Sequence, residues 1–372
     1  MICTVSTVKD TPANLERFVR RNLASGADHM FVFLDGDDSA LGRLAEIPQV
    51  TAVLADAAFW GGTKPDALNL RQISHANLVN TLLAPFDCVD WLFHIDGDEC
   101  LDLDRDRLAA VDPETRYVRL LPREALSRRD QNGEVTHFKE LLGPENLSLL
   151  ALLGVIAEPR NNSYFNGHVT GKVGIRPALN VDLLIHRAER RFEPYVPSFQ
   201  ADFLHVLHYE SFSGEEFVRK WMSHIGAGGG TRFKLDKLRL RAAISAVVDN
   251  DRLSAERKRH YLSELYRRNV EDDIETLTEL GLLVEPAPEL HQYTPRPFPA
   301  AEQQLVDRLL EHLLVAVKGG FAPGRMPASS VELLTGLASE LAPAEPELAA
   351  RLEACVARTP SEPPSGEGEG VE

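Results

Sequence analysis

Short apolar runs alternate with amphipathic segments over the N-terminal part of the chain. Each run is apolar at successive positions, as expected of a strand that is covered by helices on both faces of a sheet. Alternation of such strands with helices is typical of βα units and of a parallel sheet. The pattern therefore predicts an α/β fold, with a mostly parallel sheet flanked by helices. The predicted strands are Ile2–Thr7, Met30–Leu34, Val50–Leu54 and Trp91–Ile95.

Two helices are predicted between these strands. The first begins after Thr11, a good N-cap, and Pro12 follows it, where the missing N–H of proline costs nothing. This helix is expected to end near Gly26. The second is predicted from about Asp66 to Leu83, because apolar residues recur there at helical spacing.

The remainder of the chain is expected to contain several segments of different secondary structure. Short strands and turns are expected over residues 117–208, and helices beyond Ser213, with Gly228–Gly230 between two helical pieces. After Leu283 a proline-bearing connector leads into two or three more helices. The tail from Thr359 is rich in Pro, Gly, Ser and Glu, and is expected to be disordered.

The composition and the net charge exclude several classes of protein. With 44% hydrophobic and 26% charged residues, the chain is of the globular type, and 372 residues allow a large core. The formal net charge of -16 would repel a phosphate backbone, so nucleic acid is not an expected partner. No apolar run reaches about 18 residues, the length of a membrane span. The first residues show neither the basic segment nor the cleavage site of a secretory signal peptide. We therefore expect a cytoplasmic protein with no membrane span.

Two carboxylates follow the last of the predicted strands, in the segment WLFHIDGDE. Asp96 and Asp98 are separated by Gly97, which lets the backbone turn so that both side chains point the same way. Ligands of open α/β sheets bind outside the carboxyl ends of the strands. Clustered acidic oxygens suit a hard cation, so this segment predicts a site for Mn²⁺ or Mg²⁺. The alternative is an acidic turn that caps the next segment.

A second acidic turn, LDGDDS, follows the second predicted strand. Asp35, Asp37 and Ser39 resemble the DxDxT motif of phosphatases that use an aspartate nucleophile, with Ser39 in the place of the threonine. In those phosphatases the motif lies on the first strand, whereas here it follows the second. Two other interpretations stay open: an Asp-Gly turn, and a contact with the base or ribose of a ligand.

The order and spacing of these blocks resemble the family 2-like glycosyltransferases, whose nucleotide-sugar domain has the GT-A fold. The resemblance spans about residues 1–225. It is carried by TVKD (Thr7–Asp10), Asp35, an Arg-Gln helix (Arg71, Gln72, Asn77), WLFHIDGDE, FNGHVTGKVGIR (Phe165–Arg176) and HYESFSGEEFVRKW (His208–Trp221).

The resemblance implies a domain organisation. Residues 1–225 would form the GT-A domain, and residues 226–284 a helical extension packed on its core. Residues 285–358 would form a C-terminal helical region, followed by a disordered acidic tail over 359–372. The C-terminal helices could cover the core, pair two subunits, or bind a partner transferase of a polysaccharide pathway.

The resemblance also implies a metal site and a donor site. Asp98 would bind the metal directly, Asp96 would lie nearer the ribose, and His208 would complete the metal site, with His186 as the second choice. The expected contacts with the base and ribose are Thr7, Lys9, Asp10 and Asp35, and those with the diphosphate are Lys172, Arg176 and Arg71.

Two of these assignments have alternatives. Lys172 is expected in a glycine-rich loop between Gly171 and Gly174, whereas Arg176 could equally be a solvated surface cation. Trp60, before two glycines, would either close over the sugar or anchor its loop by packing.

The general base has two candidates. An inverting transferase needs a carboxylate that takes the proton of the acceptor hydroxyl. Glu99, beside the metal pair, and Glu158, ahead of the glycine-rich segment, could do so, while the Glu-Asp pair of the wider family is not evident.

These implications predict an inverting, metal-dependent glycosyltransferase. It would move a sugar from a nucleotide diphosphate sugar, such as a uridine diphosphate sugar, to a saccharide or glycoconjugate acceptor. One alternative is a non-catalytic GT-A-like protein that binds a glycan or a partner. The other is an aspartyl phosphatase that uses Asp35 and Asp37.

Overall fold

The computed structural model describes residues 1–131, 133–191, 197–219 and 235–360. Two compact units are present, and each is described by itself. The first comprises Met1–Leu120, Lys172–Leu204 and Glu289–Glu372, and the second Leu121–Gly171 and His205–Pro288. The predicted Gly228–Gly230 break, and residues 361–372 of the predicted tail, lie outside the described residues.

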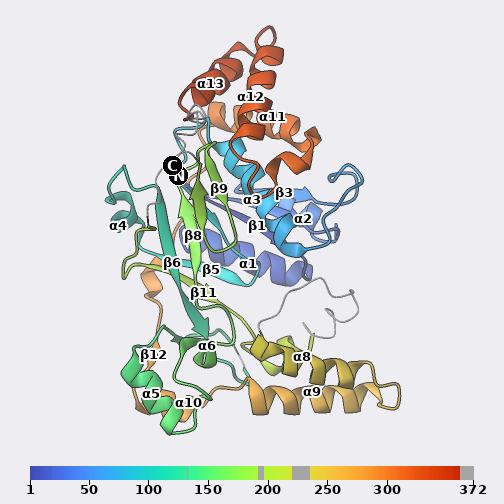
Figure 1. The fold of residues 1–372 in the computed structure, drawn as a ribbon, viewed down its shortest axis with the longest axis vertical. Coiled ribbons are helices and arrows are strands. Elements are labelled where there is room, and N and C mark those ends of the chain that lie inside the picture. Colours follow the sequence, from blue (N-terminus) through green and yellow to red (C-terminus); the bar gives the residue numbers. More distant parts are fainter. Residues whose placement is uncertain (132, 192–196, 220–234, 361–372) are drawn as a thin grey trace, which may run out of the picture. The chain divides into compact units, whose positions relative to one another are not determined.

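The sheet of the first unit confirms the predicted α/β fold (Figure 1). Strands β1 to β4 are parallel where they pair, and β8 runs antiparallel to both β4 and β6. All four strands predicted from the apolar runs are present. The strand order is β3-β2-β1-β4-β8-β6, with bounds β1 Ile2–Val8, β2 His29–Leu34, β3 Val50–Leu54, β4 Trp91–His94, β8 Lys172–Ile175 and β6 Tyr117–Ala125.

The predicted helices of this unit are also present. In α1 (Pro12–Ala24) the Thr11 hydroxyl accepts a hydrogen bond from the Asn14 N–H at 3.4 Å, as its N-cap role requires. Helix α3 (Leu68–Leu83) begins two residues later than predicted. The other elements of the unit are α2 Leu41–Ala45, β5 Glu99–Leu103, α4 Arg105–Ala109, β9 Val181–Leu183, β10 Ala188–Arg190, α11 Ala300–Val315, η2 Lys318–Phe321, α12 Ala328–Leu341 and α13 Pro346–Ala357.

One hydrophobic core joins the sheet of the first unit to its helices. Buried side chains of β1, β2 and β4 pack with α3 and with the C-terminal helices α11, α12 and α13. Helix α1 packs against β2 and β5. The C-terminal helices therefore complete the core of this unit, as Figure 1 shows by their position beside α3.

The second unit is built around the far half of β6. This half pairs in parallel with β11 (Leu204–His208) and antiparallel with β7 (Phe138–Lys139), and β7 pairs with β12 (Leu283–Val284). Two clusters of buried apolar side chains lie between its helices. These helices are α5 Pro144–Leu152, α6 Asn161–Tyr164, α8 Leu235–Val248, α9 Ala255–Asn269 and α10 Ile274–Glu279. The short η1 Pro288–His291 begins at the last residue of this unit and continues into the first unit.

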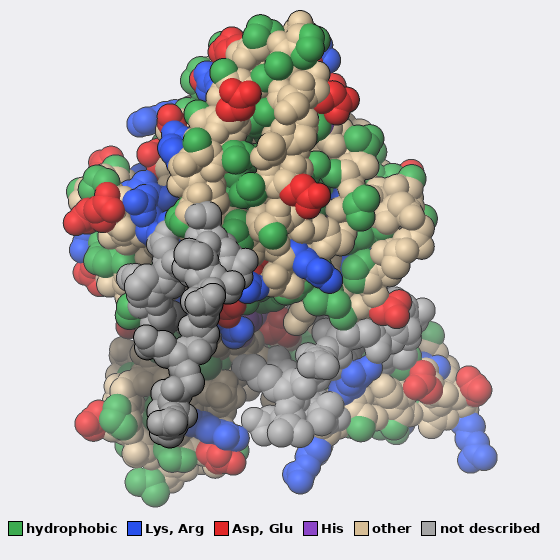
Figure 2. Space-filling view, turned by 45° about the horizontal axis from the view of Figure 1, so that its top comes forward, with side chains coloured by type: hydrophobic (Ala, Val, Ile, Leu, Met, Phe, Trp, Pro, Cys, Tyr) green, Lys and Arg blue, Asp and Glu red, His purple; other side chains and the backbone are tan. Residues whose placement is uncertain are grey.

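The chain offers no candidate for membrane crossing among the helices that the structure describes, since none combines sufficient length with sufficient hydropathy. Acidic and basic side chains are interspersed on the face shown in Figure 2. An anionic ligand on this face would therefore have to be held by individual cations rather than by a broad basic field.

Gly174 is required by the packing of β8 against β4, and its replacement by alanine tests this packing. Gly174 pairs with Phe93, and an added Cβ would lie 2.2 Å from Cε1 of the Phe93 ring. We expect Gly174→Ala to lower the free energy of unfolding by about 1–3 kcal/mol, as overpacking does. Thermal and urea unfolding measure the change.

Gly42→Ala is the matched control. Gly42 lies in α2, and an added Cβ would meet nothing within 4 Å. We expect this variant to be as stable as the parent or more stable by up to about 1 kcal/mol, because alanine favours a helix over glycine. Equal unfolding midpoints for the two variants would contradict the packing argument.

Candidate active site

A tight acidic turn follows β4 in the first unit. The Asp96 N–H donates to Oε2 of Glu99 at 2.7 Å, and the Glu99 N–H donates to the Asp96 carbonyl at 3.1 Å. A Cβ at Gly97 would lie 2.8 Å from Cγ1 of Val8. Glycine is therefore needed here because β1 approaches closely.

Lys172 neutralises part of this turn. Its Nζ lies 2.6 Å from Oδ2 of Asp96 and 3.4 Å from Oε2 of Glu99, and its side chain is fully buried. Oδ1 of Asp96 accepts a hydrogen bond from the Gln72 side chain at 2.7 Å. The structure thus brings together Asp96, Glu99 and Lys172, three of the residues that the sequence predicted for the site.

The expected loop position of Lys172 is wrong. Residues Lys172–Ile175 form strand β8, because their backbone pairs with both β4 and β6, and only the residues before Lys172 form a turn. On the strand, Lys172 faces carboxylates of its own chain. Its contact with a donor phosphate therefore stays a prediction, and it would require the ammonium to serve both partners.

Ion pairing controls the protonation of this cluster. Burial alone would raise the pKa of Asp96, but the Lys172 ammonium outweighs it and lowers that pKa. Burial alone would lower the pKa of Lys172, but Asp96 and Glu99 outweigh it and raise that pKa. Burial lowers the pKa of His94 to about 4, so this histidine is neutral at pH 7.

The charges of the cluster fit a divalent cation. Asp98 adds a third carboxylate to the field around Lys172, so the three carboxylates and one ammonium leave two formal negative charges. Oxygen ligands with this net charge suit Mn²⁺ or Mg²⁺. Asp96 itself is bound by Lys172 and Gln72, and direct coordination by Asp98 stays a prediction.

A second ion cluster surrounds Asp35 at the end of β2. Its two carboxylate oxygens face Nζ of Lys64 at 2.9 Å and Nη2 of Arg71 at 2.8 Å. Burial alone would raise the pKa of Asp35, but the two cations outweigh it and lower that pKa. The neighbouring Asp37 carboxylate accepts a hydrogen bond from the Ser39 N–H. Lys64 was not predicted, because no motif marks it in the sequence.

Thr7, at the end of β1, contacts a histidine that the sequence analysis missed. Its hydroxyl lies 2.7 Å from Nδ1 of His75, whose ring stacks on Phe33 at a centroid distance of 4.2 Å. Burial lowers the pKa of His75 to about 3. Trp60 packs against the same histidine at 5.2 Å and is buried, as expected of a residue that anchors its loop.

Three other predicted donor contacts are also placed by the structure. Lys9 is exposed, and Asp10 accepts hydrogen bonds from the Thr11 N–H at 2.6 Å and the Asn14 side chain at 3.0 Å. Arg176 lies over the Trp91 ring at 4.4 Å, at the opposite end of β4 from Asp96. The structure therefore does not bring Arg176 to the edge of the sheet where the carboxylates lie.

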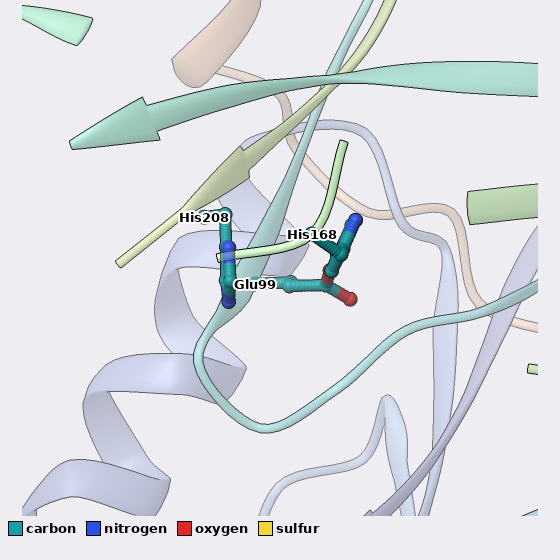
Figure 3. Close-up of side chains that lie close together, drawn as sticks. All are labelled: Glu99, His168 and His208. Atoms are coloured by element: carbon teal, nitrogen blue, oxygen red, sulfur yellow. The ribbon is translucent and has the colours of Figure 1, made fainter. Parts of the chain in front are cut away.

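Metal-ligand types are also present in the second unit. His208 ends β11, and its ring stacks on that of His168, with centroids 4.8 Å apart and ring planes 26° apart (Figure 3). Figure 3 also draws Glu99, which belongs to the first unit. Coordination of one ion by Asp96, Asp98 and His208 stays a prediction.

The two candidate bases and His186 differ in their exposure. Glu158, in the second unit, has 57% of its side chain exposed and pairs with Arg160 at 3.0 Å. Glu99, the other candidate base, is buried against Lys172. His186, the second choice as a metal ligand, is half-buried between β9 and β10 of the first unit.

The solved structures that resemble this chain include two that share little sequence with it. No family model and no curated protein matches the chain. HddC from Yersinia pseudotuberculosis is 12% identical over 56% of this chain and 89% of its own, with a TM-score of 0.26. A putative glucose-1-phosphate thymidylyltransferase from Bacillus anthracis is 9% identical over 48% of this chain and 72% of its own, with a TM-score of 0.22. Similarity at this level does not identify the family of the chain.

The ion cluster at Asp35 makes stability depend on pH. The pKa of Asp35 is lower in the folded protein than in the unfolded chain. Its contribution to the free energy of unfolding is therefore complete above the pKa of the unfolded chain, and it is lost as the pH falls through the pKa of the folded protein. At pH 7 we expect Asp35→Asn to lower the free energy of unfolding by about 1–3 kcal/mol. The difference from the parent should shrink as pH falls below about 4.

Denaturant unfolding between pH 7 and pH 3 measures this dependence. Asp38→Asn, an exposed neighbour on the same turn, serves as the control and should match the parent at each pH. A difference between Asp35→Asn and the parent that stays constant with pH would contradict the role of the ion pairs.

Proposed function

We propose that the chain is an inverting, metal-dependent glycosyltransferase that takes a sugar from a nucleotide diphosphate sugar. The observation that carries the proposal is the acidic turn after β4, where Asp96, Asp98 and Glu99 surround the buried ammonium of Lys172. The turn lies at the carboxyl end of a parallel strand, where α/β sheets bind ligands. Its surplus of two negative charges favours a divalent cation.

The proposed roles of the two aspartates are those that the resemblance implies. A bound Mn²⁺ or Mg²⁺ would neutralise the diphosphate leaving group. Asp98 would hold the cation, while Asp96, fixed by Lys172 and Gln72, would face the ribose. His208 would be the histidine ligand.

The donor's base and ribose would lie at the ends of β1 and β2. Thr7 and Asp35 are at these ends, and Lys9 and Asp10 follow directly in the chain. Arg71 reaches the same edge through its ion pair with Asp35, which supports a role for it near the donor. Thr7, Asp35 and Asp10 are held by contacts within their own chain, which would preorganise a donor site here.

The proposed acceptor is a saccharide or glycoconjugate in the cytoplasm. A carboxylate must take the proton of the acceptor hydroxyl, and Glu99 and Glu158 remain the proposed candidates. Glu158 is the more exposed of the two, which favours contact with a large acceptor. A second subunit or a partner transferase would bind through the exposed faces of the C-terminal helices.

Donor binding that depends on metal tests the proposal. The purified chain is screened by thermal shift against uridine, guanosine, cytidine and thymidine diphosphates and their sugars, each with Mn²⁺, Mg²⁺ or EDTA. We expect one nucleotide to stabilise the protein only with metal, by about 2.7 kcal/mol at 100 times its dissociation constant. No response to any nucleotide would favour a non-catalytic binding protein.

Asp98→Ala should remove this stabilisation while leaving the unfolding of the ligand-free protein nearly unchanged, because a carboxylate at a strand end contributes little to the core. Asp202→Ala is the matched control, since Asp202 is an exposed carboxylate of the same unit that pairs with Arg107. Donor binding that survives Asp98→Ala would show that the site is wrongly assigned. Loss of a phosphatase activity in Asp37→Asn, with metal binding retained, would instead support the aspartyl phosphatase.

A further inference from the structure

The ammonium of Lys172 is buried, whereas the two aspartates of the acidic turn reach the surface of the first unit. The side chains of Lys172 and Glu99 are completely buried, while 27% of the Asp96 side chain is exposed and Asp98 is half-buried. Lys172 is the first residue of β8, which runs antiparallel to β4, so it lies beside the end of β4 where the turn begins. A ligand that arrives from solvent therefore meets the aspartates before it meets the lysine.

The carboxylates of the turn are engaged by donors of their own chain. Oδ1 of Asp96 accepts a hydrogen bond from the Gln72 side chain at 2.7 Å, and Oδ2 lies 2.6 Å from Nζ of Lys172. Oε2 of Glu99 accepts a hydrogen bond from the Asp96 N–H at 2.7 Å and lies 3.4 Å from the same Nζ. A divalent cation that arrives alone has to compete with these donors. A cation bound to phosphates brings oxygen ligands with it, as Mg²⁺ commonly does in nucleotide sites.

Lys172 also determines how much negative charge the turn offers. Three carboxylates and one ammonium leave two formal negative charges, and without the ammonium there would be three. An ammonium beside the carboxylates repels a second cation, so it lowers the affinity of the turn for a metal ion. Without metal, the same ammonium compensates carboxylates that would be costly to bury alone.

The second unit contains a buried ammonium with fewer carboxylates around it. Nζ of Lys139 lies 3.0 Å from Oε1 of Glu124 and 2.8 Å from Oδ1 of Asp272. Glu124 also accepts hydrogen bonds from the backbone N–H groups of residues 166 and 167, and Asp272 accepts one from the Ser127 N–H at 2.8 Å. These two carboxylates and one ammonium leave one negative charge, which backbone donors share. The acidic turn, by contrast, has a surplus of two charges and presents its aspartates at the surface.

We propose that Lys172 is the resident counter-ion of the acidic turn, which keeps the turn folded without metal and makes firm binding of the divalent cation depend on the diphosphate. The inference rests on the proposed metal-dependent function and adds the form in which the metal enters, as its complex with the nucleotide diphosphate. Lys172 acts through Asp96 and Glu99, so it is a positioning residue.

Lys172→Met in the full-length chain tests the inference without any measurement of turnover. Thermal unfolding is measured in EDTA and in Mn²⁺, and the Mn²⁺ affinity is measured by calorimetry without nucleotide. We expect the variant to lose thermal stability in EDTA, because a buried ion pair broken on one side leaves its partner uncompensated. Mn²⁺ should restore much of this loss and should bind at least about 10-fold more tightly than to the parent, because the repelling charge is gone.

Lys318→Met is the matched control. Lys318 is a buried lysine of the same unit, and its ammonium donates to the backbone carbonyls of Leu314 at 2.6 Å and of Ala316 at 2.7 Å. Carbonyls carry no formal charge, so this replacement should lower stability equally in EDTA and in Mn²⁺. A Lys172→Met variant that Mn²⁺ stabilises no more than it stabilises Lys318→Met would overturn the inference.

A double variant covers the case in which Lys172→Met alone does not fold. Lys172→Met combined with Glu99→Gln removes one charge of each sign, so it should fold in EDTA and bind Mn²⁺ about as weakly as the parent. A folded double variant would support the role of charge. A double variant that is as unstable as Lys172→Met would instead show that the lysine acts by packing, and would overturn the inference.

The outcomes also separate this inference from the proposed function. Unchanged Mn²⁺ affinity in Lys172→Met, with metal-dependent nucleotide binding in the parent, would overturn the counter-ion and leave the transferase standing. Tighter Mn²⁺ binding in the variant, with no nucleotide diphosphate bound by the parent, would support the counter-ion and contradict the transferase. A parent that binds Mn²⁺ alone as tightly as it does with a nucleotide diphosphate would overturn the dependence on the diphosphate.

Discussion

The burial of Lys172 between Asp96 and Glu99 is the constraint on which the first unit's candidate site depends. An ammonium without its hydration is costly unless carboxylates surround it, and carboxylates so close together are costly without a cation. Each partner therefore holds the other in place at 2.6 and 3.4 Å. Because Lys172 belongs to β8 and the carboxylates follow β4, the pairing of these strands also determines the geometry of the acidic turn.

The second unit uses the same principle around Glu124. Lys139 and Asp272 complete its charge, and the backbone of residues 166–167 occupies its oxygens. The loop with His168 is thus held by hydrogen bonds that an apolar core could not supply. In both units a buried ion pair fixes polar groups that could meet a ligand, which is expected where function requires preorganised charge.

Much of the fold was predictable from local patterns. The four N-terminal strands follow from apolar runs, and Thr11 with Pro12 marks the start of α1 to the residue. The acidic turn could be predicted because a strand and its following carboxylates are adjacent in the chain. Lys64, which pairs with Asp35, and His75, which stacks on Phe33, could not, because those contacts join segments that are distant in sequence and no spacing rule connects them.

By itself the sequence determined the α/β class and the position of Asp96 and Asp98 after a buried strand, because periodicity and residue order are local properties. The tertiary structure decided which charges meet. Lys172 was expected in a loop and lies on a strand beside Asp96, and Arg176 lies at the far end of β4. Such pairings depend on strand order and register, which arise from packing over the whole sheet and from the burial energy of each charge.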